Sequence, residues 1–298
     1  MSASVPETRV LVMVNRSKPS AHDACDTVVE TLGRSGRVIR VVDAIEPEWL
    51  PEAGAVDAAI VLGGDGTILR AAKLCLGLGC PLVGVNTGKV GFMAGYELGR
   101  FLNEAPRIMH DVSRHAQRHA PLMRADISGS AAREDDAPIA LNDFVITAGP
   151  PYRMIEIDIS IDGHPGPTIA GDGVIVSSPI GSTAYSVSSG GPIVAPGVRA
   201  WVVVPIAAHS LSFRPIVVDA DSVISLTLRS ANSDNGHGTS LLADGQPCVR
   251  VAEGDRVEVR DDGRGVSFLV DPGVDYWTTL IRKMRWAQAP GGHGITDD

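Results

Sequence analysis

Short apolar runs alternate with segments of helical periodicity through the first third of the chain. Four of the runs have the length and composition of strands that are buried on both faces, and apolar residues recur at helical spacing between them. Strands joined by helices require crossover connections, so this pattern predicts an α/β domain with a parallel, doubly wound sheet. We expect strands at Val10–Asn15, Val38–Asp43, Ala58–Leu62 and Pro81–Val85, and helices at Ala21–Arg34 and Ile68–Leu78.

The pattern changes after about Asp111, where long helical periodicity gives way to short β-rich runs separated by turn signals. We therefore expect residues 1–110 to form the α/β domain and residues 111–270 to form a mostly-β domain. Residues 271–288, which include a predicted helix at Tyr276–Trp286, should return to the first domain, and residues 289–298 should form a disordered tail. The strands of the second domain are expected at Met154–Ile161, Val174–Ser177, Ala200–Pro205, Ile216–Val218, Val223–Leu228 and Arg256–Val259.

Composition and charge narrow the class of protein. The chain has 298 residues, of which 44% are hydrophobic, so it can bury a large core, and its net charge of −9 argues against a nucleic-acid partner. The short basic clusters Arg114–Arg118 and Arg282–Arg285 are interpreted as solvated surfaces. No apolar run is long enough to span a membrane, and the four cysteines form no Cys-x-x-Cys pair. These features predict a cytoplasmic protein without a membrane partner.

The first stretch that carries chemistry is Gly63-Gly64-Asp65-Gly66-Thr67, between a predicted strand and a predicted helix. Glycines let backbone N–H groups approach a phosphate, and the start of a helix adds partial positive charge. The P-loop and Rossmann glycine patterns are both absent. Two interpretations of Asp65 remain open from this turn alone: the acid holds Mg²⁺ or accepts a proton from a hydroxyl, or it merely caps the helix.

The second stretch, Gly171 to Pro196, reads GDGVIVSSPIGSTAYSVSSGGPIVAP. It holds far more Gly, Ser and Thr than a packed β domain needs, and strand-like segments flank it too closely for a linker. Its acid, hydroxyls and backbone donors suit hydrogen bonding to a polar ligand with ribose and amide groups.

Together with GVNTGKVGF (Gly84–Phe92), LND (Leu141–Asp143), PIAAHSLSFRPIVV (Pro205–Val218) and DGQ (Asp244–Gln246), these stretches resemble the NAD kinase family in content and order. The GGDG turn by itself is shared with lipid kinases and phosphofructokinases. The resemblance implies an α/β N-terminal domain and an all-β C-terminal domain. It also implies transfer of the γ-phosphoryl group of ATP to the 2′-hydroxyl of the adenosine ribose of NAD, which gives NADP.

The resemblance also implies roles for individual residues, with Asp65 as the proton acceptor. Asn142 and Asp143 would bind the ribose hydroxyls, and Mg²⁺ would arrive with ATP rather than at a dedicated metal site. A homo-oligomer is expected. The NAD contacts implied are Asp65, Gly66, Arg70, Phe92, Asn142, Asp143, Asp172, Thr183, Ala184, Tyr185, Ser188 and Gln246, and the phosphate contacts are Gly63, Gly64, Gly66 and Thr67.

Three positions depart from the family pattern. Asp143 stands where Glu is usual, Ile180 replaces a hydroxyl residue, and Ala170 stands where Arg or His is frequent. Two alternatives to an NAD kinase follow: a dinucleotide-binding sensor with weak catalysis, and another GGDG-type kinase that acts on a lipid or a sugar. Formation of NADP from NAD and ATP distinguishes the three.

Overall fold

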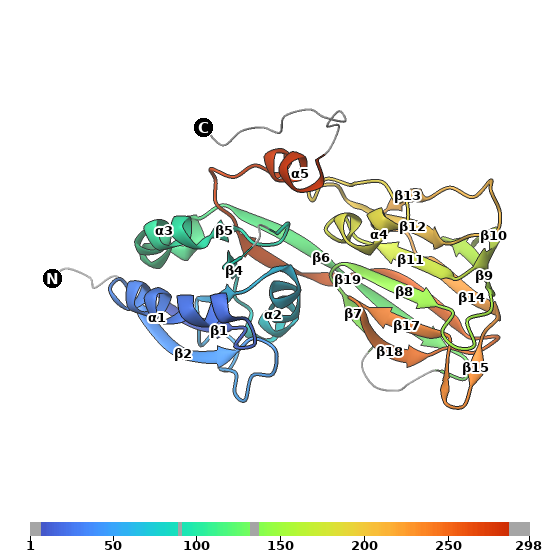
Figure 1. Ribbon diagram of the computed structural model, residues 1–298, viewed down its shortest axis with the longest axis horizontal. Helices are drawn as coiled ribbons and strands as arrows, with labels where there is room; N and C mark the ends of the chain where they lie inside the picture. Colours follow the sequence, from blue (N-terminus) through green and yellow to red (C-terminus); the bar gives the residue numbers. More distant parts are fainter. Residues whose placement is uncertain (1–6, 89–90, 132–136, 286–298) are drawn as a thin grey trace. The chain divides into compact units, whose positions relative to one another are not determined.

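The computed structural model describes residues 7–88, 91–131 and 137–285, which belong to two compact units (Figure 1). The first unit comprises Met1–His119 together with Val266–Asp298, and the second comprises Ala120–Gly265. The tail expected at residues 289–298 lies outside the described residues. None of the four cysteines forms a disulfide bond, and no helix among the described residues is long and apolar enough to cross a membrane.

The first unit contains a parallel sheet in the order β2-β1-β3-β4, and the end of β19 pairs with β4, also in parallel. Every residue of β3 and β4 is buried, as the continuous apolar runs predicted. Helix α1 connects β1 to β2 and helix α2 connects β3 to β4, so the predicted helical crossovers are confirmed for these two connections, whereas residues 44–57, between β2 and β3, form no helix. The elements are β1 (Arg9–Val14), α1 (Pro19–Gly33), β2 (Arg37–Asp43), β3 (Ala58–Leu62), α2 (Asp65–Leu78), β4 (Leu82–Asn86), β5 (Tyr96–Glu97), α3 (Leu98–His110) and the 3-10 turn η1 (Val112–Arg114).

Helices α1 and α3 pack on the same face of this sheet. Val28 and Leu32 of α1 and Phe101 and Ile108 of α3 share one apolar cluster with alternate residues of β1 and β3. The buried residues of α2 lie outside this cluster. Sequence reasoning did not predict α3, which contains Pro106, a residue that normally interrupts helices.

The second unit is a sandwich of antiparallel strands. One sheet has the order β13-β12-β11-β8-β17-β18, and the other contains β10-β9-β14-β19, with β6 paired to β19 and to β7. Phe144 and Trp201 of the first sheet share a buried cluster with Ile157 and Leu226 of the second, so this core lies between the sheets. The strands not yet bounded are β6 (Gln117–Ser128), β7 (Ile139–Ala140), β8 (Asp143–Thr147), β9 (Ile155–Ile161), β10 (His164–Gly171), β11 (Gly173–Ser177), β12 (Ala200–Ile206), β13 (Ile216–Asp219), β14 (Ile224–Ser230), β15 (Ser233–Asp234), β16 (His237–Gly238), β17 (Ser240–Ala243), β18 (Gln246–Arg250) and β19 (Arg256–Leu269).

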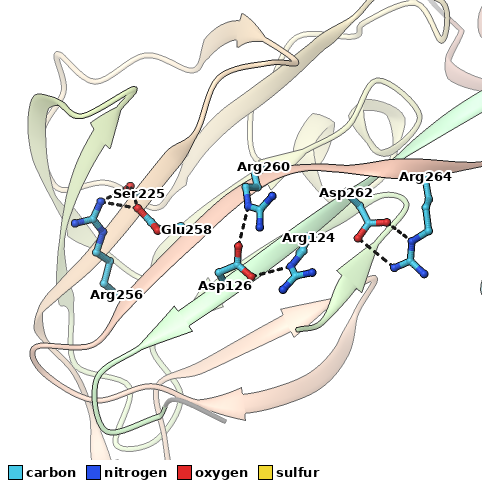
Figure 2. Close-up of polar contacts among 8 residues, drawn as sticks. All are labelled: Arg124, Asp126, Ser225, Arg256, Glu258, Arg260, Asp262 and Arg264. Atoms are coloured by element: carbon cyan, nitrogen blue, oxygen red, sulfur yellow. Dashed lines mark hydrogen bonds and ion pairs between the residues drawn. The ribbon is translucent and has the colours of Figure 1, made fainter. Parts of the chain in front are cut away.

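Strand β19 is much longer than the expected run Arg256–Val259. The sequence Asp261-Asp262-Gly263 indicated a turn, but these residues continue the strand, and Gly263 alone among them has positive φ, at 79°. Their charges are balanced locally: Figure 2 shows Asp262 against Arg264, while Asp126 of β6 accepts from Arg124 at 2.7 Å and from Arg260 at 2.8 Å. Because Asp126 and Asp262 are each paired with arginine, the strand can continue through this charged sequence where a turn was expected.

Three short helical segments complete the described structure. The 3-10 turn η2 (Gly181–Thr183) and α4 (Tyr185–Ser188) lie within the Ser/Gly-rich stretch after β11, and α5 (Tyr276–Met284) follows the end of β19. Helix α5 is in the first compact unit, and it ends two residues before the expected end, at Met284, because Arg285 adopts the left-handed conformation with φ 50°.

Candidate active site

The GGDGT stretch connects a buried strand directly to a helix. Strand β3 ends at Leu62, Gly63 and Gly64 follow, and α2 begins at Asp65 with Gly64 as its N-cap residue. No side chain caps this helix. The interpretation of Asp65 as a simple helix cap is therefore wrong, because the carboxylate bonds elsewhere.

The Asp65 carboxylate accepts hydrogen bonds from the segment of the same unit that follows β4. The backbone N–H of Phe92 donates to Oδ2 at 2.9 Å, and the backbone N–H of Met93 donates to Oδ1 at 3.1 Å. A Cβ on Gly91 would lie only 1.7 Å from Asp65 Oδ1, so a glycine is required for this approach. The side chain remains one-third exposed and accessible to a substrate.

The rest of the turn is also tightly constructed. Asn15, at the end of β1, donates from Nδ2 to Thr67 Oγ1 at 2.8 Å, and both residues are buried. A Cβ on Gly63 would come within 2.7 Å of the Thr67 side chain. Gly64 and Gly66 have open space at their Cβ positions, and Arg70 is exposed with its Nε bonded to the carbonyl of Ile45 at 2.7 Å.

Two basic side chains near Asp65 were missed by sequence reasoning. Lys283 of α5 lies 3.4 Å from Asp65 Oδ2, and its Nζ lies 4.6 Å from the centre of the Phe92 ring. Arg118 of β6 is partly buried and donates to the carbonyl of Phe92 at 3.4 Å. The expectation that both basic clusters are solvated surfaces is therefore wrong for Arg118, whereas Lys283 is exposed, as expected, and is also paired with Asp65.

The sequence contained a signal for one of them. Tyr276 and Lys283 are seven residues apart, so they lie on the same face of α5. The Tyr276 ring lies 6.5 Å from that of Phe92, and Lys283 lies over the same Phe92 ring. No comparable periodicity identifies Arg118, whose position depends on how β6 pairs.

In the second unit, a carboxylate organises the Asn142-Asp143 motif. Asp244, in the turn between β17 and β18, accepts from the backbone N–H groups of Leu141 (3.1 Å), Asn142 (2.7 Å) and Asp143 (3.3 Å). The backbone N–H of Asp244 donates in return to the carbonyl of Asp143 at 2.9 Å. The Asp-Gly turn that precedes Gln246 thus fixes the backbone of the predicted ribose-binding residues.

The Ser-rich stretch packs against the same motif. Ser178 donates from its hydroxyl to the carbonyl of Leu141 at 2.6 Å and from its backbone N–H to that of Asn142 at 2.8 Å. A Cβ on Gly181 would lie 2.0 Å from the Asn142 carbonyl oxygen. Asn142 Oδ1 is buried and has no hydrogen-bond partner, so one acceptor of the motif is available to a ligand donor.

The remaining predicted residues of this unit divide between the two ends of β11. Asp172 precedes the strand and is exposed, whereas Ser177, at the other end, is paired with Asp143 of β8. Five strand residues separate these ends by about 17 Å, which is the length scale of a dinucleotide rather than of one nucleoside. Thr183 and Ala184 are half-buried, Tyr185 is 46% exposed, Ser188 and Gln246 are exposed, and Ile180 is buried.

The first unit has a glycine–acid turn at the start of a helix, and the β-sandwich unit carries a hydroxyl-rich stretch. Together these features define a class of GGDG-type kinases. The comparisons identify the family within it. Residues 41–113 match the ATP-NAD kinase N-terminal domain, and residues 141–269 match the ATP-NAD kinase C-terminal domain. The chain belongs to the NAD kinase family.

Relatives and solved structures agree with the domain matches. The chain is 35% identical to the NAD kinase of Methylibium petroleiphilum over 250 residues, 80% of each chain, and 34% identical to that of Symbiobacterium thermophilum over 283 residues, 92% of this chain and 97% of the relative. The fold is similar to yeast NADH kinase complexed with NADH (TM-score 0.80, 22% identity, 99% and 91% coverage). It is also similar to an NAD kinase from Archaeoglobus fulgidus in complex with ATP (TM-score 0.73, 24% identity, 93% and 99% coverage). The predicted fold class is confirmed.

Proposed function

We propose that this protein is an NAD kinase, which transfers the γ-phosphoryl group of ATP to the 2′-hydroxyl of the adenosine ribose of NAD. The observation that carries the proposal is the Asp65 carboxylate, held by two backbone donors at the start of a helix in a chain of this family. The lipid- or sugar-kinase alternative is not favoured, because the curated relatives reported above are NAD kinases over most of the chain.

Asp65 is proposed as the proton acceptor. An ionised carboxylate offers about four lone-pair directions. The N–H groups of Phe92 and Met93 and the ammonium of Lys283 use three of them, which leaves one for the proton of the attacking hydroxyl. The new bond joins the 2′-oxygen to the γ-phosphorus, the bond from that phosphorus to the β,γ-bridging oxygen breaks, and Asp65 takes the proton.

The second unit is proposed to hold NAD. Asn142 and Asp143 bind ribose hydroxyls, Gln246 adds a contact, and the exposed Tyr185 ring with Thr183, Ala184 and Ser188 contacts the adenosine part. Asp172 serves the nicotinamide end, and its separation from Asp143 along β11 supports that division. In the first unit, Gly63, Gly64, Gly66 and Thr67 contact phosphate, and Arg70 and Phe92 contact NAD.

Mg²⁺ is proposed to enter as part of the ATP complex. Among the described residues, no group of three or more His, Cys, Asp or Glu side chains gathers as a metal site, and the Asp65 carboxylate is already engaged by nitrogen donors. Phosphate and water oxygens suit Mg²⁺ well, and the ion neutralises triphosphate charge when bound. We also propose a homo-oligomer, which light scattering coupled to size-exclusion chromatography would test.

The function is tested by incubating the purified protein with NAD, ATP and Mg²⁺ and detecting NADP with an NADP-specific dehydrogenase. We expect NADP to form, and Asp65→Asn to lower kcat by about 10²–10⁴-fold, because the variant loses the proton acceptor. NAD binding by Asp65→Asn should stay near that of the unmodified protein. NAD binding without NADP formation in the unmodified protein would instead identify a dinucleotide sensor.

A further inference from the structure

Arg118 is a partly buried cation with incomplete hydrogen bonding. Its Nε is fully buried and has no partner, and its other described contacts are the Phe92 carbonyl and the face of the Phe268 ring, 5.6 Å from the guanidinium carbon. Burial lowers the pKa of Arg118, and the charge of Asp65 opposes that shift. A buried N–H of a guanidinium costs free energy when it has no acceptor, so an anionic ligand that accepts from it would stabilise Arg118.

A cavity of about 180 Å³ opens beside Arg118 within the first unit, and Phe92, Tyr276 and Thr279 are among its lining residues. The hydroxyl of Tyr276 is also buried without a hydrogen-bond partner. Two independent donors, one from β6 and one from α5, are therefore unsatisfied at one small cavity.

Two carboxylates also line this cavity, and each is already engaged. Asp271 is buried and accepts from Arg100 at 2.8 Å and from the Gly273 N–H at 2.8 Å. Asp275 caps α5 by accepting from the Thr278 N–H at 2.9 Å. Neither has a hydrogen bond to Arg118, so the guanidinium charge is not compensated by a direct carboxylate contact.

Lys283 brings a second cation to Phe92, with its Nζ 4.6 Å from the centre of the ring. In the structure its ammonium is paired with Asp65 at 3.4 Å. When Asp65 accepts a proton during transfer, its carboxylate loses its charge, and the Lys283 ammonium becomes free to pair with the phosphoryl group that arrives beside it. Such an interaction is stronger in the transition state than in the ground state, which is the condition for catalysis.

We propose that Arg118 and Lys283, which both contact Phe92, form a polyphosphate subsite for the phosphoryl donor. Arg118 and the Tyr276 hydroxyl bind the phosphate chain, and Lys283 stabilises the phosphoryl group in transit. The inference rests on the proposed kinase function for the role of Lys283, whereas the binding role of Arg118 can be measured without catalysis.

The binding role is tested by calorimetry with Mg·ATP and with inorganic tripolyphosphate, both without NAD. We expect Arg118→Met to weaken both ligands by about 10–100-fold, as for loss of charge-assisted hydrogen bonds, with NAD binding unchanged. The affinity of Arg118→Lys for both ligands should lie between those of the unmodified protein and of Arg118→Met, because lysine keeps the charge but loses the planar fork of donors. The control is Arg114→Met, which removes an exposed cation of η1 that is paired with Asp111.

Unchanged binding of both ligands in Arg118→Met and in Arg118→Lys would overturn the subsite. If Arg118→Met does not fold, the Arg118→Lys result decides alone. In the unmodified protein, tighter binding of ATP than of tripolyphosphate identifies a nucleotide donor, and equal binding identifies a donor recognised through phosphates alone; both outcomes support the subsite.

The role of Lys283 is tested by steady-state kinetics. Lys283→Met should lower kcat by about 10²–10³-fold with the KM for NAD unchanged, and Lys283→Arg should recover part of the loss. Arg282→Met, the adjacent cation on α5, is the control and should retain activity. An unchanged kcat in Lys283→Met would overturn this role. Failure of the unmodified protein to form NADP, with tripolyphosphate binding still dependent on Arg118, would overturn the kinase function and leave the subsite standing.

Discussion

At the scale of single residues, the site depends on places where a side chain would not fit. Asp65 can receive the N–H groups of Phe92 and Met93 only because Gly91 has no Cβ. The same principle applies to Gly63 beside Thr67. Glycines in this site therefore divide into two kinds: Gly64 and Gly66 have open space at their Cβ positions, as the proposed phosphate contacts need, whereas Gly91 allows the Asp65 carboxylate to pack against the backbone.

Gly91→Ala tests the second use. The added Cβ would overlap Asp65 Oδ1, so the carboxylate must rotate or the loop must shift. We expect kcat to fall by about 10²-fold or more, since misplacement of a catalytic group by about 1 Å has that effect. The assay is NADP formation.

Gly88→Ala is the matched control in the same loop, because nothing lies within 4 Å of the position of its Cβ and its φ is not positive. Equal activity of the two variants would show that the geometry around Asp65 does not require Gly91.

At the scale of elements, the proposed NAD-binding stretch of the second unit is a loop that neighbouring strands support. The turn between β17 and β18 supplies Asp244 to the N–H groups that precede β8, and the stretch after β11 supplies Ser178 to the carbonyls of the same segment. Ser182 adds a hydrogen bond within the same stretch, because its hydroxyl accepts from the Val194 N–H at 3.0 Å. Some hydroxyls of this Ser/Thr-rich stretch, those of Ser178 and Ser182, therefore hold the stretch itself in place.

Gly181→Ala probes this support. Its Cβ would lie 2.0 Å from the Asn142 carbonyl oxygen, and backbone cannot move aside as a flexible side chain can. We expect a loss of about 1–3 kcal/mol in the free energy of unfolding, as for overpacking, together with weaker NAD binding. Urea denaturation and calorimetry with NAD measure the two effects.

Gly197→Ala, in the same stretch of chain but with open space at its Cβ, should change neither quantity. Weaker NAD binding by Gly197→Ala as well would show that the effect does not arise at the Asn142 backbone.

At the scale of the whole molecule, the chain leaves the first compact unit along β6 and returns to it along β19. The returning segment is fixed in the first unit by Asp271. Its carboxylate is buried and bonded to Arg100 of α3, and its backbone N–H donates to the carbonyl of Gly95 at 3.1 Å. This anchor precedes α5, which carries Tyr276 and Lys283 to Phe92.

A double-mutant cycle measures the anchor. Arg100→Met should lower the urea midpoint of unfolding markedly, because it leaves a buried carboxylate without its cation. Adding Asp271→Asn should recover part of that loss, since the neutral amide no longer needs the cation and its oxygen can still accept from the Gly273 N–H. A double variant that is less stable than Arg100→Met alone would contradict this account.

The sequence by itself determined the parallel α/β unit, the β-rich unit and the family, because buried parallel strands are continuous apolar runs and the ligand loops are local strings of residues. The boundaries of β3 agree with the expectation at both ends. Helix α3 was missed because Pro106 masks its periodicity, and the length of β19 was missed because its charges are neutralised across strands. Only the tertiary structure decided that Asp65 bonds to the Phe92 loop instead of capping its own helix, and that Arg118 and Lys283 join it. These contacts connect residues 27 to 218 positions apart, and no local pattern of residue types encodes such distances.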